Sequence, residues 1–289
     1  MSALTITRAG PLATLQDAGR FGMLAHGISA SGPMDRGAFA AAGAQLERAG
    51  ATGIEITAAG LAFRAEGPLH LGCAGGTFGL SVNGKARDWP GRLALEAGDV
   101  VEVTPGPAGN YGYLRFDREI EVPPLLGSRA TNLTVGLGGF KGRALRAGDR
   151  IAFGGEGAAA VAANAVAGEG PIRVLWGLHA ELFDAPVRAA FAGGRFAISP
   201  SLDRMGVRLA DPDGVFRAQR RLSLVSDAIV PGDIQILGDG TPIVLMRDHQ
   251  PTGGYPRIAT VVSADLDRFA QLRPGAEIRF RPVTLEHAR

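Results

Sequence analysis

A long series of short apolar runs, each followed by turn residues, constrains the fold of this chain more than any other sequence feature. LTITRA (residues 4–9), DVVEVT (99–104) and PIRVLW (171–176) are three of these runs, and each has the length and pattern of a β-strand. Glycine accounts for 43 of the 289 residues, about twice its usual share of ~7%, which favours turns over long helices. Strands at this spacing are typical of β-barrels and β-sandwiches. The sequence therefore predicts a mainly β protein built from barrel domains, with a few short helices.

Local signals place one hairpin and three helices. Asn83-Gly84, between the two halves of the strand-like segment 77–87, is the strongest short hairpin signal in the chain. The predicted helices cover residues 34–48, 185–191 and 264–272, and Ser263 is the candidate N-cap of the last one.

One phrase occurs three times. LEAGDVVEV begins at Leu95, LRAGDRIAF at Leu145 and LRPGAEIRF at Leu272, and each places a glycine turn before an alternating strand. Two explanations stay open. The phrase is either a turn-to-strand solution shared by many β-proteins or the mark of a duplicated barrel unit.

A second similarity supports duplication. QDAGRFG (16–22) resembles LDRMGVR (202–208), and the segment between the two halves, residues 154–170, has the small-residue composition of a linker. We therefore predict two similar β-barrel domains, over residues 1–160 and 161–289.

Charge and composition argue against several classes of protein. The net charge is only +2 and the arginines form no stripe, so nucleic-acid binding is not expected. Cys73 is the one cysteine and the five histidines lack metal-ligand spacing, so no metal site is expected. The most apolar stretch, residues 157–168, is too short to span a membrane, and the N-terminus has no signal-peptide pattern. A cytoplasmic protein that binds no membrane is the default expectation.

Three groups of polar residues are candidate ligand-binding sites. Each group has a structural alternative: a surface turn with a local Asp–Arg pair, a helix cap, or an Asp–Arg network. The groups are Gln16, Asp17 and Arg20 in TLQDAGRFG, Ser31 and Asp35 in HGISASGPMD, and Asp203, Arg204 and Arg208 in SLDRMGVRL.

A glycine-rich loop is a candidate for phosphate binding. GLGGFKGR (136–143) presents backbone amides and Lys141, as phosphate-binding loops do, although its spacing is not that of a Walker A loop. Lys141 in this loop and Arg208 in SLDRMGVRL are the candidate nucleotide-binding residues, because phosphoryl transfer needs positive groups around the developing charge. The usual hydrolase templates, such as the Gly-x-Ser-x-Gly elbow, are absent from the sequence.

The segment DHQPTGGYP (248–256) has the highest density of chemically useful groups. Its acid follows a buried-looking strand, its amide and hydroxyl offer hydrogen bonds, and its two glycines allow a ligand to approach the backbone closely. Its tyrosine adds a flat apolar wall with a polar tip. The set suits a small amide or carboxylate ligand, and a Gly-Gly turn with an Asx cap is the structural alternative. The candidates are Asp248 as the catalytic residue and Gln250, Thr252, Gly253, Gly254 and Tyr255 as substrate-binding residues.

The order and spacing of five segments are those of one known family. The segments are GPLATLQDAGRFG, GISASGPMD, LGSRATN, SLDRMGVRL and GDIQILGDGTPIVLMRDHQPTGGYPRIATVVSADLDRFAQLRPGAEIRF. Together they resemble the allophanate hydrolase subunit 2-like family, also called the biotin-dependent carboxyltransferase-like family. This family includes the C subunit of bacterial 5-oxoprolinase and the carboxyltransferase portion of urea carboxylase.

The resemblance implies a fold, partners and a reaction. The fold would be two cyclophilin-like β-barrel domains. The partners would be a B-type subunit, related to the other half of the carboxyltransferase unit, and an A-type subunit. The complex would use ATP, with Mg²⁺, to open 5-oxoproline to glutamate. This chain would be inactive alone and would carry no biotin.

Two departures from the family pattern bear on the substrate. Pro251 stands where the family usually has a threonine, and the helix after SGPMD lacks two of the family's asparagines. Three functions stay open: a subunit of an ATP-dependent 5-oxoprolinase, a carboxyltransferase-type subunit that uses urea or another small amide, and a non-catalytic regulatory partner. The first is favoured because the chain has no fused biotin carboxylase or biotin-carrier region.

Overall fold

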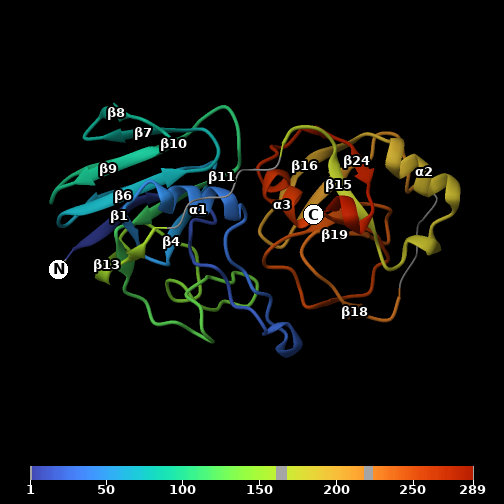
Figure 1. Cartoon of the computed structure of the whole chain (residues 1–289), viewed down its shortest axis with the longest axis horizontal. Coiled ribbons are helices and arrows are strands. Elements are labelled where there is room, and N and C mark those ends of the chain that lie inside the picture. Colours follow the sequence, from blue (N-terminus) through green and yellow to red (C-terminus); the bar gives the residue numbers. More distant parts are fainter. Residues whose placement is uncertain (1, 161–167, 218–223, 289) are drawn as a thin grey trace. The chain divides into compact units, whose positions relative to one another are not determined.

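The chain folds into two compact units, each rich in β-strands (Figure 1). The computed structural model describes residues 2–160, 168–217 and 224–288. The first unit is Met1–Phe21 with Ala30–Ala165, and the second is Gly22–Ser29 with Val166–Arg289. The mainly β fold with barrel-like sheets and short helices is as predicted. The predicted boundary after residue 160 stays a prediction, because residues 161–167 of the predicted linker lie outside the described part.

The first unit is built from two main sheets. Among its described residues, a seven-stranded sheet and a five-stranded sheet enclose one apolar core. The first sheet has the order β12 (Arg118–Ile120), β13 (Arg150–Glu156), β1 (Ala3–Ala9), β5 (Leu61–Ala65), β10 (Val100–Pro105), β7 (Phe78–Val82), β8 (Lys85–Arg87). The second has the order β2 (Thr14–Gln16), β4 (Gly53–Thr57), β11 (Tyr111–Phe116), β6 (Leu69–Ala74), β9 (Gly91–Leu95), and β3 (Arg48–Ala49) pairs with β14 (Ala158–Ala159).

Side chains at every second position of the strands point inward and build the core of the first unit. Ile54 and Ile56 of β4 point inward beside Leu61 and Phe63 of β5, and all four are fully buried. The two strands flank a turn at Gly60, yet they belong to different sheets. This turn therefore carries the chain from one sheet to the other.

The second unit is a nearly closed sheet. Its edge strands β23 (Glu277–Ile278) and β24 (Phe280–Pro282) follow one another in sequence, so the sheet must curl until its two edges meet the same chain segment. Between them lie, in order, β16 (Phe196–Leu202), β17 (Gly206–Ala210), β20 (Pro242–Leu245), β19 (Asp233–Ile236), β22 (Arg257–Val261) and β15 (Ile172–Trp176). A separate short pair joins β18 (Asp227–Ala228) to β21 (Thr252–Gly253).

Aromatic rings fill the core of the second unit. Phe191 stacks on Phe280 with a centroid separation of 5.0 Å, and it also contacts Phe196 and Phe216. All four rings are buried, and rings at these separations gain about 0.5–1.5 kcal/mol per pair beyond their area burial. Packed phenylalanine rings thus make up a large part of the core of this unit.

The three copies of the repeated sequence phrase, which begin at Leu95, Leu145 and Leu272, form the same kind of turn. Gly98, Gly148 and Gly275 all have a positive φ, between +86° and +96°, and each N–H donates to a strand carbonyl at 2.8 Å. Two copies lie in the first unit and one in the second. The phrase therefore does not mark one copy per barrel, and the shared-turn explanation accounts for it.

The three predicted helices are present with different bounds. They are α1 (Arg36–Ala44), α2 (Ala185–Gly193) and α3 (Ser263–Ala270), with short 3₁₀ turns at η1 (Leu24–His26), η2 (Ala180–Leu182) and η3 (Leu285–Ala288). The prediction that the first helix reaches residue 48 is wrong, because Arg48 belongs to strand β3, which pairs with β14. The N-cap prediction for Ser263 is also wrong, since Val262 is the N-cap and Ser263 is the first helical residue.

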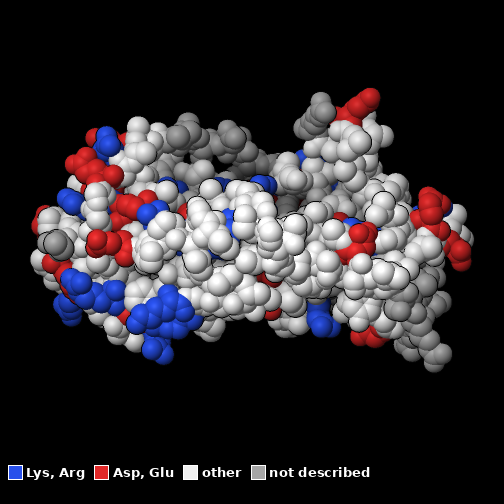
Figure 2. Space-filling model, turned by 90° about the horizontal axis from the view of Figure 1, so that it is seen from below, with Lys and Arg blue, Asp and Glu red and all other residues white. Residues whose placement is uncertain are grey.

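Charged side chains lie in small groups on the surface. On the face shown in Figure 2, Lys and Arg gather in patches beside Asp and Glu, and uncharged residues cover most of the area. Within the described residues, no helix has the length and apolarity needed to cross a membrane.

Candidate functional site

The polar residues singled out from the sequence form two clusters, one in each unit. The first cluster joins QDAGR, SGPMD and LGSRATN, and Asp17 is its link. The Asp17 carboxylate accepts hydrogen bonds from Ser128 Oγ and the Arg129 N–H, both at 2.6 Å, and from the Gly19 N–H at 2.9 Å. One side chain at the end of β2 thus fixes a segment more than a hundred residues away in the sequence.

Arg20 is a buried cation within the same cluster. Its side chain is 1% exposed, and its guanidinium donates to the carbonyl oxygens of Leu125, Ser128 and Ala130 at 2.8–3.2 Å. The Arg20 N–H also donates to the carbonyl oxygen of Ala30 at 2.6 Å. Arg20 therefore orders LGSRATN and joins QDAGR to the segment that precedes SGPMD.

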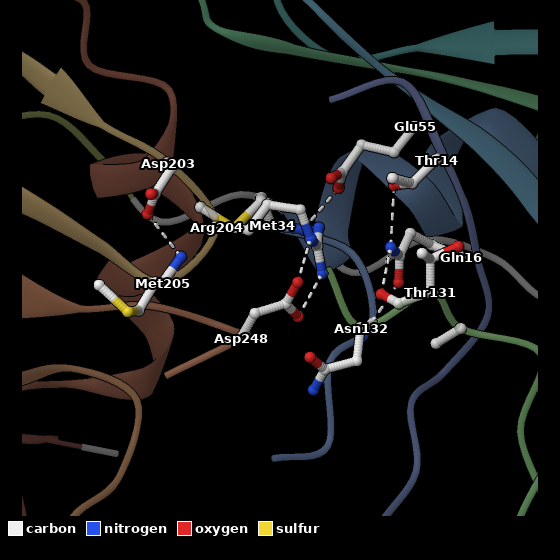
Figure 3. Close-up of polar contacts among 12 residues, drawn as sticks. Thr14, Gln16, Met34, Glu55, Thr131, Asn132, Asp203, Arg204, Met205 and Asp248 are labelled. Carbon is white, nitrogen blue, oxygen red and sulfur yellow. Dashed lines mark hydrogen bonds and ion pairs between the residues drawn. The ribbon is translucent and has the colours of Figure 1, made fainter. Parts of the chain in front are cut away.

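Gln16 connects QDAGR to SGPMD directly. Its Nε2 donates to Thr14 Oγ1 at 2.9 Å and to the Thr131 carbonyl oxygen at 3.1 Å, and its Oε1 accepts the Gly32 N–H at 3.1 Å. Figure 3 shows the Gln16 side chain turned toward Thr14 and Thr131. Gln16 therefore brings QDAGR and SGPMD side by side within the first unit.

Glu55 and Tyr113 belong to this cluster, and sequence reasoning missed them. The strand register puts Thr14, Glu55 and Tyr113 in one row across β2, β4 and β11, so their side chains project from the same face. Helix α1 covers this face beside β11 and β6, which makes Glu55 and Tyr113 fully buried. A glutamate between two isoleucines looks like a solvent-facing strand residue, and no sequence signal marks it otherwise.

Hydrogen bonds tie Glu55 and Tyr113 to SGPMD. Glu55 Oε2 accepts the Met34 N–H at 2.7 Å (Figure 3) and the Tyr113 hydroxyl at 2.9 Å. The Tyr113 hydroxyl accepts the Asp35 N–H at 2.8 Å. Burial, with the neighbouring charges of Glu55 and Asp35, raises the pKa of Tyr113 well above 10.0, so the phenol keeps its proton. The Asp35 carboxylate accepts the Ala38 N–H at 2.8 Å and is the N-cap of α1. The helix-cap alternative therefore holds for Asp35.

The second cluster is centred on a buried ion pair. Arg204 Nε and Nη2 donate to the two carboxylate oxygens of Asp248 at 3.0 and 3.1 Å, and both side chains are at most 2% exposed. The Asp248 N–H also donates to the Arg204 carbonyl oxygen at 2.7 Å. Figure 3 shows this fork-like contact between the guanidinium and the carboxylate. Asp248 is thus held rigidly where β20 ends.

The glycines of DHQPTGGYP lie against other parts of the chain. A Cβ at Gly253 would overlap the side-chain amide of Gln235, which is 1% exposed. The carbonyl oxygen of Gly254 accepts the Leu224 N–H at 2.7 Å, and a Cβ at Gly254 would lie 2.9 Å from the Leu224 carbonyl oxygen. Both glycines therefore allow this segment to pack closely against Gln235 and Leu224 of the same unit.

The other residues of this segment differ in exposure. Thr252 and Tyr255 are exposed and Gln250 is half-buried, so these side chains are accessible to a ligand. His249 is buried, and its Nδ1 lies 2.6 Å from the Gln250 carbonyl oxygen. The accessible groups thus lie beside the rigid Asp248.

A buried polar layer beneath β18 and β21 was also missed from the sequence. Arg257 donates to the Asp227 carboxylate at 2.6 Å and to the Ala228 carbonyl oxygen at 2.8 Å, and it lies 3.4 Å from Asp233. Gln235 is the register partner of Arg257 on β19, so both side chains project from one face of the sheet. These residues support the segment that contains Asp248.

Three predicted site residues lie elsewhere. Asp203 is exposed, and its carboxylate accepts the N–H groups of Met205 and Gly206 at 2.8 and 3.0 Å, which caps a turn. Arg208 is exposed on β17, and Lys141 is exposed with its Nζ 5.6 Å from the Phe140 ring centroid. Over residues 2–160, 168–217 and 224–288, no group of His, Cys, Asp or Glu is arranged to hold a metal ion.

Comparison with known proteins gives the family. A family model described as carboxyltransferase domain, subdomain A and B, matches residues 26–282. The chain is 36% identical to the C subunit of 5-oxoprolinase from Escherichia coli, covering 99% of this chain and 93% of that protein. It is 31% identical to the Haemophilus influenzae protein of the same name, covering 96% and 90%. The chain belongs to the family of carboxyltransferase domains that comprise subdomains A and B.

Solved structures agree on the fold. The crystal structure of the Kluyveromyces lactis urea amidolyase matches with a TM-score of 0.88 at 24% identity over 99% of this chain. The crystal structure of TTHA0988 matches with a TM-score of 0.81 at 27% identity over 97% of this chain and 55% of that one. This chain spans only 19% of the K. lactis protein, and it spans 17% of the Lachancea kluyveri urea amidolyase, to which it is 27% identical.

Proposed function

We propose that this chain is the C subunit of an ATP-dependent 5-oxoprolinase, which converts 5-oxo-L-proline, ATP and water to L-glutamate, ADP and phosphate. The observation that carries the proposal is the mutual coverage with the E. coli protein, 99% of this chain and 93% of that one. The urea amidolyase relatives are several times longer than this chain. A subunit of this kind works with others, so we place the activity in a complex with the A and B subunits of the enzyme, in the cytoplasm, and expect this chain to be inactive alone.

Opening a lactam requires groups that bind an amide and a carboxylate and that stabilise developing negative charge. In this proposal Asp248 accepts the lactam N–H through its carboxylate, which Arg204 holds in a fixed orientation beside the accessible side chains that follow it. Gln250, Thr252 and Tyr255 bind the remaining polar groups of the ligand from their accessible positions. Gln16, Asp17, Arg20, Ser31 and Asp35 would serve a ligand in the first unit, where the hydrogen bonds described above hold Gln16, Asp17, Arg20 and Asp35.

The surroundings of the predicted nucleotide-binding residues, Lys141 and Arg208, are poorly suited to binding ATP. The loop that contains Lys141 has positive φ at Gly136, Gly138 and Gly139, as phosphate-binding nests do. However, its Leu137, Gly139 and Gly142 N–H groups already donate to carbonyl oxygens of the chain. With Arg208 exposed on β17, these described residues form no cradle for a triphosphate and Mg²⁺. We therefore place ATP on another protein of the complex.

A second candidate function rests on the urea amidolyase relatives and the fold match at a TM-score of 0.88. It is a carboxyltransferase-type role with urea or another small amide. The two candidates separate in one assay: the chain is combined with ATP and its partner subunits, and is offered 5-oxo-L-proline or urea. Glutamate release supports the first candidate. Urea consumption without glutamate release supports the second, and no turnover of either amide leaves the non-catalytic partner role.

A further inference from the structure

Ser31 has a backbone conformation that serine rarely adopts. Its φ is +57°, in the left-handed region, which costs roughly 1–2 kcal/mol for a residue with a Cβ. Leu12, Asn83, Leu126 and Lys141 are the other non-glycine residues of the described chain with positive φ, and none of them is buried. Ser31 is only 6% exposed. Its strain therefore cannot be explained by a surface turn.

The first cluster holds Ser31 from both sides. Before it, the Ala30 carbonyl oxygen accepts the Arg20 N–H at 2.6 Å. After it, the Gly32 N–H donates to Gln16 Oε1 at 3.1 Å, and the Met34 N–H donates to Glu55 Oε2 at 2.7 Å. Strained residues persist only where the surrounding structure over-determines them, and they concentrate where ligands bind.

The Ser31 hydroxyl has no hydrogen-bond partner among the described residues. Leaving a buried hydroxyl unpaired costs about 1–3 kcal/mol. The strained backbone fixes the direction of the unpaired Ser31 hydroxyl before any ligand binds, and this arrangement lowers the stability of the chain. A preorganised hydroxyl of this kind gains its missing hydrogen bond when a ligand oxygen arrives.

We propose that Ser31 Oγ donates a hydrogen bond to a carbonyl or carboxylate oxygen of a small amide substrate. The proposal rests on the function proposed above and assigns one contact in it to the first unit. Glu55 and Tyr113 are positioning residues for this contact, because they hold the backbone that follows Ser31.

Two substitutions at Ser31 distinguish the effect of its hydroxyl from the effect of its backbone strain. Ser31→Ala removes the hydroxyl and keeps the strained Cβ, whereas Ser31→Gly removes both, since glycine adopts positive φ freely. We expect Ser31→Gly to melt at or above the wild-type temperature and Ser31→Ala to melt below Ser31→Gly. In the complex with its partner subunits, both variants should lose about three- to tenfold in kcat/KM for 5-oxo-L-proline, the factor expected for one neutral hydrogen bond.

Thr52 supplies the matched control. Its Oγ1 is also buried without a hydrogen-bond partner in the described chain, and its φ is not positive. Thr52→Val should keep wild-type kcat/KM. Wild-type activity in the Ser31→Gly complex, an equal loss in the Thr52→Val complex, or failure of Ser31→Gly to fold would each overturn the proposal.

Failure of the proposed function has a different signature. If the wild-type complex consumes urea and releases no glutamate from 5-oxo-L-proline, the proposed function fails. The same three variants assayed with urea then decide the role of Ser31. A wild-type complex that turns over neither amide overturns both.

Discussion

At the scale of single residues, Asp248 forms a buried ion pair with Arg204, so a substitution at Asp248 changes the stability of the chain as well as its activity. Both side chains are at most 2% exposed, so removing one takes an oppositely charged contact away from a buried charge. Breaking a buried pair in this way costs about 3–5 kcal/mol, whereas replacing both partners by apolar residues is often neutral. A loss of activity in an Asp248 variant therefore needs a stability measurement beside it.

We expect Asp248→Ala to lower the free energy of unfolding by about 3–5 kcal/mol. The Arg204→Met/Asp248→Leu double variant should recover most of that loss, because no uncompensated charge remains. Urea denaturation of the isolated chain, followed by circular dichroism, measures both. A loss below about 0.5 kcal/mol for Asp248→Ala, the range of ordinary surface changes, would show that the pair is not buried in solution.

The candidate site was predictable from the sequence only in part. Gln16 and Asp17 stand out because several polar side chains gather around one glycine turn between apolar segments. Glu55 and Arg257 do not stand out, since each lies in a strand that alternates normally. Their burial depends on the elements that cover the strand, α1 for Glu55 and the β18–β21 pair for Arg257. Which element covers which face is a long-range property that local patterns do not contain.

At the scale of elements, α1 lies directly against β6 at Gly72. A Cβ at Gly72 would clash with the Ala42 carbonyl oxygen of α1, and Leu46 closes the same space. The φ of Gly72 is not positive, so the requirement for glycine comes from the close approach of the helix. Helix α1 begins directly after SGPMD, which makes its distance from the sheet part of the first cluster's geometry.

Gly72→Ala should destabilise the chain by about 1–3 kcal/mol, the usual cost of overpacking. Gly154→Ala is the control, because Gly154 also lies in a strand of the first unit, and a Cβ there meets no atom within 4 Å. The control should change the free energy of unfolding by less than about 0.5 kcal/mol or raise it slightly. Equal losses in the two variants, measured by thermal melting, would contradict the close packing of α1 on β6.

Strands were predictable as segments, but their partners were not. The apolar runs around residues 4–9, 53–65, 99–104 and 171–176 all contain strands. The period of two in side-chain direction identifies a strand and its buried face, yet it does not say which strand pairs with it. β18 and β21 were missed because each has two residues and no alternation.

At the scale of the whole chain, the buried His249 and the half-buried His179 link stability to pH. Burial lowers the pKa of His249 from its ordinary value of 6.5, and burial followed by the charge of Arg257 lowers the pKa of His179. Asp233 and Asp248 oppose the shift at His249, and Arg247 adds to it. Below about pH 6.5 the unfolded chain therefore binds more protons than the folded chain, and stability falls as the pH falls.

We expect the free energy of unfolding to decrease between about pH 7.5 and about pH 5.5, and His249→Asn to weaken that dependence. Hydrogen bonds from Arg143 lower the pKa of Asp149 from 3.8, so its contribution is lost only below about pH 3.8, outside this window. Urea denaturation at several pH values measures the slope. A slope of zero, or one that steepens in His249→Asn, would contradict a buried neutral His249.

Glutamate release by the purified partner subunits, with and without this chain, is the measurement that tests the proposed function most directly. With ATP and 5-oxo-L-proline present, we predict that glutamate and ADP form in equal amounts only when this chain is added, and that this chain alone forms neither. The same glutamate release without this chain, or turnover by this chain alone at the rate of the complex, would contradict its role as a required subunit of an ATP-driven 5-oxoprolinase.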